Sequence, residues 1–406
     1  MTNWRATMSI IEQSECDFCH TSFSAPIYFP KNTRRAMQVY VCENCGLIQS
    51  SQGVPEPERI QTLSTDADWG NVRHGKGVRF EFLRTILETE IHWEGISRVA
   101  DVGSNRGDFV LWLNNNHPKV ECWAIEPDKS VVENYAHIQQ VNLHLDRLEN
   151  VPLPNDYFDL IFCSHTLEHA DTAAEMIEII RKALRPGGML LLEVPNLQGI
   201  TGQDVIEEFF IDKHTFHFDR ETLIDYVTSS GFSVLRGLND NDELNITLLL
   251  CRDAESVVYH PIAGISRATR NFEWINLFAN RMPINRQLLK WIVQEKLRPL
   301  GARQKVGYWG GGRILDTLLK YGGLRPDDIF CLVDSHLHKI VKETNGIRIE
   351  RPEMLRILEP QVLVTLGRSS ENLMAKSAYS FGIRHVVMFS ELMGQARNAS
   401  DLRSAK

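Results

Sequence analysis

The chain has 406 residues, of which 43% are hydrophobic and 24% charged, and its formal net charge is −8. This length suffices for two or three domains, and the acidic balance excludes a whole-chain field that attracts nucleic acid or an anionic membrane. No stretch reaches the roughly 20 apolar residues of a membrane helix, and Met1–Arg5 lacks the apolar core of a signal peptide. We therefore expect a cytoplasmic protein that does not contact a membrane.

Four of the eight cysteines form two short motifs near the N-terminus, Cys16-x-x-Cys19 and Cys42-x-x-Cys45. This paired spacing is typical of a structural zinc site, whose closed tetrahedral shell has no open position for catalysis. We expect Zn²⁺ in a module over residues 1–60, with four free thiols or a redox pair as the alternatives. The other cysteines stand singly in apolar runs, where reduced and buried thiols are expected: Cys122, Cys163, Cys251 and Cys331.

Residues 61–253 alternate between helix-like and strand-like patterns. Strands are expected near residue 99, over 120–124, near 143, and over 158–163, 189–194, 231–232 and 245–250. Helices are expected within 66–95, from 109, from 129 and over 173–184. Such alternation predicts an α/β fold with a parallel sheet covered by helices on both faces.

The C-terminal part is predicted to contain a helical arm over residues 254–304, a second, smaller Rossmann-like domain over 305–395 and a disordered polar tail over 396–406. This domain opens with the glycines Gly307 and Gly310–Gly312, and Asp334 follows its next strand. A nucleotide site, with Trp309 stacking on a base, is one interpretation of this loop. A domain that only shapes a cleft and an oligomer interface is the other.

The most informative motif is the loop Asp101–Gly107, which lies between a predicted strand and a predicted helix. Gly103 and Gly107 permit a positive φ and a close approach of the backbone to a ligand, and the helix start offers unpaired N–H groups. A dinucleotide fold usually shows G-x-G-x-x-G with an acidic residue about 20 positions later. Here Asn105 replaces the second glycine and Glu126 is the acid. Together with Asp101, this pattern favours S-adenosylmethionine over NAD.

Several residues at the predicted strand ends are candidates for binding that cofactor. Glu126 follows the second strand and is predicted to accept both ribose hydroxyls. Asp101 is expected to position the loop and the cofactor's amino group, or only to stabilise the turn. Asp146 is assigned to the adenine and Ser164 to the methionine end, whereas Glu168 and His169 are interpreted as a helix start. The complete predicted set is Asp101, Gly103, Ser104, Asn105, Gly107, Glu126, Asp146 and Ser164.

These motifs resemble the class I methyltransferases that use S-adenosylmethionine, on the segments DVGSNRG, YFDLIFCSHTLEH and RPGGMLLLEVPN and the turn Glu126–Asp128. The knuckle VCENCGLIQS, the stretch Trp69–His74 and the glycine-rich C-terminal domain follow the order seen in the nucleotide-deoxysugar C-methyltransferases. The resemblance implies a zinc-binding module, a methyltransferase sheet and a Rossmann-like C-terminal domain. It further implies a sugar substrate, most simply a nucleotide-linked sugar, in saccharide or natural-product biosynthesis.

In that family, a Tyr-His-Glu-His run ends in a histidine that acts as general base, and the matching positions here are Ile211–His214. Only the histidine is retained. Enolate formation also needs groups that stabilise developing charge, whereas a hydroxyl acceptor needs only a base, so carbon and oxygen both stay open as the methylated atom. His214 and His217 are the predicted catalytic residues, with packing as the alternative. A metal site on His-x-x-His lacks a third ligand, so metal-independent transfer is predicted.

Two other functions are compatible with the sequence. One is an RNA-modifying methyltransferase that uses the zinc ribbon as its substrate reader; the acidic balance and the few basic residues between the knuckles, Lys31, Arg34 and Arg35, disfavour nucleic acid as a partner. The other is a non-catalytic binding or assembly protein with a retained cofactor pocket. Monomer and homodimer are both left open.

Overall fold

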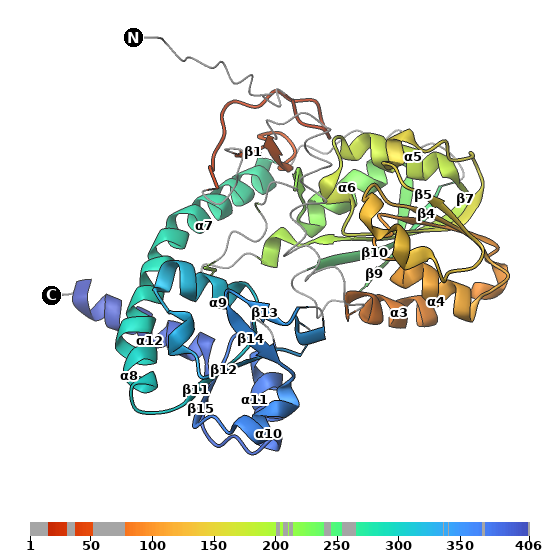
Figure 1. Ribbon diagram of the computed structural model, residues 1–406. Coiled ribbons are helices and arrows are strands. Elements are labelled where there is room, and N and C mark those ends of the chain that lie inside the picture. Colours follow the sequence, from red (N-terminus) through yellow and green to blue (C-terminus); the bar gives the residue numbers. More distant parts are fainter. Residues whose placement is uncertain are drawn as a thin grey trace, which may run out of the picture. The chain divides into compact units, whose positions relative to one another are not determined.

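The computed structural model describes residues 15–30, 37–51, 78–199, 204–205, 210, 214–238, 245–253, 265–335, 337–339, 341–367 and 370–404 (Figure 1). The chain divides into two compact units. Unit 1 contains Met1–Thr201 and Glu207–Asn276, and unit 2 contains Gly202–Ile206 and Leu277–Lys406. Among the described residues, no helix is both long enough and apolar enough to cross a bilayer.

Unit 1 is built on a seven-stranded sheet with the order β5-β4-β3-β6-β7-β10-β9. Strands β3 to β7 pair in parallel, whereas β10 is antiparallel to both β7 and β9. The expectation of an all-parallel sheet is therefore wrong at this edge, because the six residues between β9 and β10 are too few for the crossover that parallel neighbours need. The strands are β3 Arg98–Val102, β4 Glu121–Ile125, β5 Val141–His144, β6 Phe158–Ser164, β7 Leu184–Pro195, β9 Phe232–Leu238 and β10 Asn245–Arg252.

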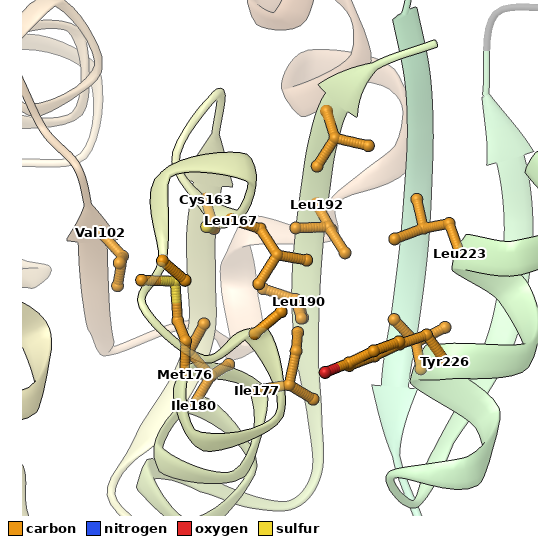
Figure 2. Close-up of a cluster of buried hydrophobic side chains, with 14 of the residues drawn as sticks. Val102, Cys163, Leu167, Met176, Ile177, Ile180, Leu190, Leu192, Leu223 and Tyr226 are labelled. Carbon is orange, nitrogen blue, oxygen red and sulfur yellow. The ribbon is translucent and has the colours of Figure 1, made fainter. Parts of the chain in front are cut away.

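Helices cover this sheet, and alternate strand residues divide between two hydrophobic clusters. In β7, Leu190 and Leu192 belong to one cluster and Leu191 to the other, as expected for a sheet buried on both faces. Figure 2 shows the first cluster, in which Met176, Ile177 and Ile180 of α5 meet the strands. The α-helices before residue 230 are α3 Val78–Glu90, α4 Asp108–Asn116, α5 Ala173–Ala183 and α6 Arg220–Ser229.

Short 3-10 segments occupy most of the remaining connections. The helix expected from residue 129 is one of these segments, a 3-10 turn in which the Asp128 side chain accepts a hydrogen bond from the Ser130 N–H. These segments are η1 Trp93–Gly95, η2 Lys129–Tyr135, η3 Leu148–Asn150, η4 Leu167–His169 and η5 Leu197–Gly199.

The N-terminal module forms a second sheet in unit 1. Strands β1 Gln38–Val41 and β2 Ile48–Ser51 form an antiparallel pair, and β8 Phe216–His217 adds to the free edge of β2. The residue after β8, Phe218, forms a parallel bridge to Asn196 at the end of β7. The module is thus joined through β8 to the edge of the central sheet.

The long helix α7 Ile265–Ile292 lies within the segment predicted to be a helical arm, and it begins in unit 1 and ends in unit 2. Unit 2 holds a six-stranded sheet with the order β13-β14-β12-β11-β15-β16, in which only the β13–β14 pair is antiparallel. Its strands are β11 Val306–Trp309, β12 Cys331–Val333, β13 Glu343–Thr344, β14 Ile347–Glu350, β15 Val362–Thr365 and β16 Val386–Met388.

Helical segments complete unit 2. The expectation of a disordered polar tail from residue 396 is wrong as far as residue 404, because helix α12 runs from Phe389 to Ser404. The other segments are the π-helices η6 Val293–Leu297 and η7 Leu318–Gly322, the α-helices α8 Arg298–Gly301, α9 Arg313–Thr317, α10 Leu355–Leu358 and α11 Glu371–Ser380, and the 3-10 turns η8 Pro326–Asp328, η9 Leu337–Lys339 and η10 Pro352–Met354.

Candidate functional site

The loop between β3 and α4 has the conformation that its glycines suggested. Gly103 has φ +76° and Gly107 has φ +79°, the region that favours glycine. A Cβ added at Gly103 would lie 1.9 Å from Oγ1 of Thr166. That hydroxyl is itself held by the carbonyls of Val102 and Ser164 at 3.1 Å. Only glycine therefore lets the loop pass between the ends of β3 and β6.

Glu126 directly follows β4, and its carboxylate accepts hydrogen bonds from backbone N–H groups, one of which belongs to the glycine loop. One carboxylate oxygen accepts from the Asn105 N–H at 2.8 Å and the other from the Asp128 N–H at 2.9 Å. Burial raises the pKa of Glu126, and these two hydrogen bonds oppose that rise. A carboxylate offers about four lone-pair positions, so two contacts leave capacity for a ligand's hydroxyls.

Asp101 is the second buried acid at this edge. Its side chain lies in β3 between β4 and β6, with Ala124 and Phe162 as its strand neighbours. Burial raises the pKa of Asp101 well above its usual range, and the charges of Glu126 and Asp108 raise it further. Two buried carboxyl groups that disfavour each other's ionisation form a site where a cationic ligand is favoured.

Tyr135, which the sequence did not suggest, holds the same loop from η2. Its hydroxyl donates to the Asn105 carbonyl at 2.9 Å and lies 2.6 Å from Oγ of Ser104. A Cβ at Gly107 would come within 3.0 Å of the Tyr135 ring. Ser104 is thus engaged inside the protein, and Tyr135 fixes the loop's shape.

The two remaining candidates for cofactor binding have partners within unit 1. Asp146 is exposed after β5 and accepts from the Arg147 N–H at 2.7 Å and from Asn150 Nδ2 at 2.9 Å. Its hydrogen bonds to Asn150 and to the Arg147 backbone lower its pKa. Ser164 donates to Glu193 at 2.9 Å. Contacts of both residues with a cofactor remain predictions.

Three residues that the sequence did not connect converge beside this edge: Glu168, His169 and His214. Their ligand-type atoms all lie within 4.8 Å of one another. The rings of His169 and His214 are 4.9 Å apart, and the Thr215 N–H donates to the Glu168 carbonyl at 2.8 Å, which fixes His214 beside η4. Glu168 and His169 lie in the 3-10 segment η4, and the sequence did not predict that His214 would lie beside them.

His217 has a different environment. Its Nε2 lies 2.6 Å from Oγ of Ser50 in β2, and the Phe210 ring is 4.7 Å away. Burial lowers its pKa to about 3, so it is neutral near pH 7. These contacts agree with the packing alternative, and catalysis by His217 remains a prediction. Residues 211–213, which match the family's run, lie outside the described residues.

The four clustered cysteines converge in the N-terminal module. Their sulfurs lie within 4.8 Å of one another, with Cys16 and Cys45 at 3.5 Å and Cys19 and Cys42 at 3.3 Å. Each motif forms a turn closed by a backbone hydrogen bond, from His20 to the Cys16 carbonyl and from Gly46 to the Cys42 carbonyl. Two turns that present four thiols to one point could hold a metal ion, and this donor set is of the kind that structural zinc sites use.

The C-terminal glycine loop is held together by Asp334, whose two carboxylate oxygens accept from the N–H groups of Gly311 at 2.9 Å and Leu337 at 2.7 Å. Trp309 is buried in β11, stacks on Phe381 and donates to Ser335 at 3.2 Å. The expectation that Trp309 stacks on a nucleotide base is therefore wrong, because its ring faces are within the core.

The edge just described belongs to the α/β domains that bind a cofactor where parallel strands end. Residues 74–236 match the family described as methyltransferase domain. The match covers the part of the chain that contains the central sheet from β3 to β7 and the glycine loop, and this part is similar to methyltransferase domains.

The curated relatives match this chain over part of its length. A tRNA U34 carboxymethyltransferase of Campylobacter curvus is 26% identical over 142 residues, which cover 34% of this chain and 44% of that protein. The same-named protein of Desulfotalea psychrophila is 27% identical over 153 residues, covering 36% and 44%. The uncharacterized methyltransferase YcgJ of Bacillus subtilis is 28% identical over 102 residues, covering 23% and 39%. The chain thus spans less than half the length of these relatives.

Solved structures of S-adenosylmethionine-dependent methyltransferases are also similar. One from Aquifex aeolicus has a TM-score of 0.35 and 15% identity, covering 49% of this chain and 99% of that one. One from Mesorhizobium loti has a TM-score of 0.36 and 14% identity, covering 41% and 96%.

Proposed function

We propose that this protein transfers a methyl group from S-adenosylmethionine to an acceptor bound beside His214. The observation that carries the proposal is the pair of buried acids, Asp101 and Glu126, at two neighbouring strand ends around a glycine loop. Glu126 would accept the ribose hydroxyls through its remaining lone pairs. Asp101 and Glu126 would favour the positively charged sulfonium and amino groups of the cofactor.

His214 is the proposed general base of the transfer. The cofactor would supply a methyl group on a positively charged sulfur that leaves as a neutral thioether, and the His214 imidazole would take the proton that the acceptor loses when it is methylated. A histidine titrates near neutral pH and suits this step. The Thr215 hydrogen bond to Glu168 supports a fixed position for this residue.

The acceptor is the open part of the proposal, and two observations favour different classes. The names of the relatives from Campylobacter curvus and Desulfotalea psychrophila favour tRNA, so the comparisons support an RNA acceptor better than the sugar that the resemblance implied. These matches cover about a third of this chain, and we propose RNA modification on the strength of the names alone.

The charge of the N-terminal module favours the other class. Between its two Cys-x-x-Cys motifs it has only three basic residues, Lys31, Arg34 and Arg35, and the acids Glu15, Asp17 and Glu43 stand at or beside the motifs. Phosphate groups are held mainly by lysine and arginine, so this part of the module is a poor RNA reader. We therefore retain a nucleotide-linked sugar as the second candidate acceptor.

We further propose that Zn²⁺ is held by Cys16, Cys19, Cys42 and Cys45. Four thiols packed this closely in a buried cluster fit that ion, which would stabilise the module without taking part in the reaction.

Incubation with methyl-labelled S-adenosylmethionine and two acceptor panels, unmodified tRNA and nucleotide-linked sugars, tests the proposal. We expect label in one panel, loss of turnover in His214→Ala, and unchanged turnover in His137→Ala, an imidazole outside the site. Mass analysis distinguishes a methyl from a carboxymethyl product. Calorimetry shows whether His214→Ala still binds the cofactor. Labelling of neither panel, together with no cofactor binding, would refute the proposed function and favour the non-catalytic alternative.

A further inference from the structure

Glu168 is a buried acid near the cofactor edge whose side chain has no hydrogen bond within the described residues. Its side chain is 2% exposed, and both carboxylate oxygens are buried without a hydrogen-bond partner there. A buried carboxylate without a partner lowers the stability of the folded state by roughly several kcal/mol, unless a positive charge or a hydrogen-bond donor compensates. A buried unsatisfied carboxylate in a folded protein therefore points to an ion or a functional role.

The contrast with its neighbour Glu193 shows that burial alone does not explain this. Glu193 is equally buried, but its two oxygens accept from the hydroxyls of Ser164 and Thr247, each at 2.9 Å. The recorded ion pairs of Glu168 involve only imidazoles, with His165 Nδ1 at 3.4 Å and His169 Nε2 at 3.8 Å from Oε1. Neither distance is that of a good hydrogen bond.

The groups around Glu168 are instead arranged as metal ligands. One carboxylate and the two imidazoles of His169 and His214 present donor atoms within 4.8 Å of one another. Ligands bound at about 2.0–2.2 Å lie roughly 3–4 Å apart around zinc, so small side-chain rotations would bring these three onto one ion. Nitrogen and oxygen donors of this kind suit Zn²⁺, Fe²⁺ and Mn²⁺.

We propose that Glu168, His169 and His214 bind a divalent transition-metal ion, separate from the thiol site of the N-terminal module. Two backbone features hold the ligands in place. His165 adopts φ +51° at the end of β6, a strained conformation for a residue other than glycine, and the Thr215 N–H bonds the Glu168 carbonyl. Three protein ligands leave coordination positions open, as in catalytic rather than structural sites.

Such an ion would act on the acceptor side of the reaction. A bound hydroxyl loses its proton more easily on a divalent cation. In the metal-bound chain the ion would therefore replace the free-base role that the proposed function gives to His214, and His214→Ala would lose turnover in either case. The binding itself does not depend on which acceptor is used, so it can be measured without turnover.

Two experiments test this inference. The first measures the metal content of the purified full chain, and the second titrates the chelator-treated chain with Co²⁺. We expect two ions per chain, one with the thiolate-to-cobalt absorption of a cysteine site and one without it. Glu168→Gln should lose only the second, and His169→Ala should do the same.

The matched control is Glu193→Gln, the same change at a buried acid that already has donors, and it should retain both ions. A wild-type chain whose only bound cobalt shows thiolate absorption would overturn the inference, whether or not the variants fold. Two ions retained in folded Glu168→Gln would overturn it as well. Calorimetry on the same samples measures the binding of S-adenosylmethionine. A chain that binds the cofactor but no second ion would contradict the metal site alone, whereas a chain that binds no cofactor would contradict the proposed function.

Discussion

The two glycine loops of the molecule are built on the same plan and differ in what surrounds them. In each, an acid after the next strand accepts two backbone N–H groups: Glu126 from Asn105 and Asp128, and Asp334 from Gly311 and Leu337. The carboxylate therefore has a loop-holding role in both units. Such an acid is by itself no evidence of a ligand.

The two loops differ in the residue that lies two positions before the glycine at which each loop leaves its strand. Asp101 precedes Gly103, whereas Tyr308 precedes Gly310. The helix after the central loop, α4, has nine residues, but α9 has five before it changes to a π-helix. A second buried acid and a regular helix start thus mark the loop that we expect to bind a cofactor.

The largest effect is expected from Gly103→Ala. A Cβ there meets Thr166 at 1.9 Å and forces a side chain into a positive φ, which together should cost about 2–5 kcal/mol of unfolding free energy. Gly312→Ala is the control in the other loop, because nothing lies within 4 Å of the added Cβ. Denaturant unfolding measures both, and equal stabilities would show that the loops do not differ in this way.

A smaller effect is expected from Glu126→Gln. Losing a charged acceptor of the ribose hydroxyls costs about 1.5–3 kcal/mol, so the Kd for S-adenosylmethionine should rise at least about tenfold. Asp334→Asn, the same change in unit 2, should leave this Kd unchanged while lowering thermal stability. If calorimetry finds both variants equally impaired in cofactor binding, the assignment of the site to the central loop is wrong.

The smallest effect is a dependence of stability on pH. Burial raises the pKa of Asp101 above its unfolded value of about 3.9, so the cofactor-free folded state binds more protons than the unfolded one. Stability should therefore be greatest below that unfolded pKa and decline as pH rises through the raised value. Melting temperatures across this range should show a shallower decline for Asp101→Asn, and an unaltered slope would remove Asp101 as the source.

Local patterns were enough to predict the seven strands of the central sheet, from the strand near residue 99 to the strand over 245–250, because buried strands are apolar runs bounded by turn residues. They did not predict that β10 runs antiparallel, or that β13 and β14 form a hairpin, because pairing direction depends on partners elsewhere in the chain. The same limit applies to the site. The loop and Glu126 were found from their spacing, whereas the meeting of Glu168 with His214 depends on β8 joining two sheets.

That short strand has a consequence for exchanging parts between related proteins. Ile48 and Gln49 of the N-terminal module pair with His217 and Phe216, and Phe218 bridges to the central sheet. A chimera that replaces residues 1–60 alone would separate one half of this pairing from the other. The part of the chain that can be exchanged as a unit is therefore discontinuous. The module and the segment 214–218 must be replaced together if His214 is to keep its position.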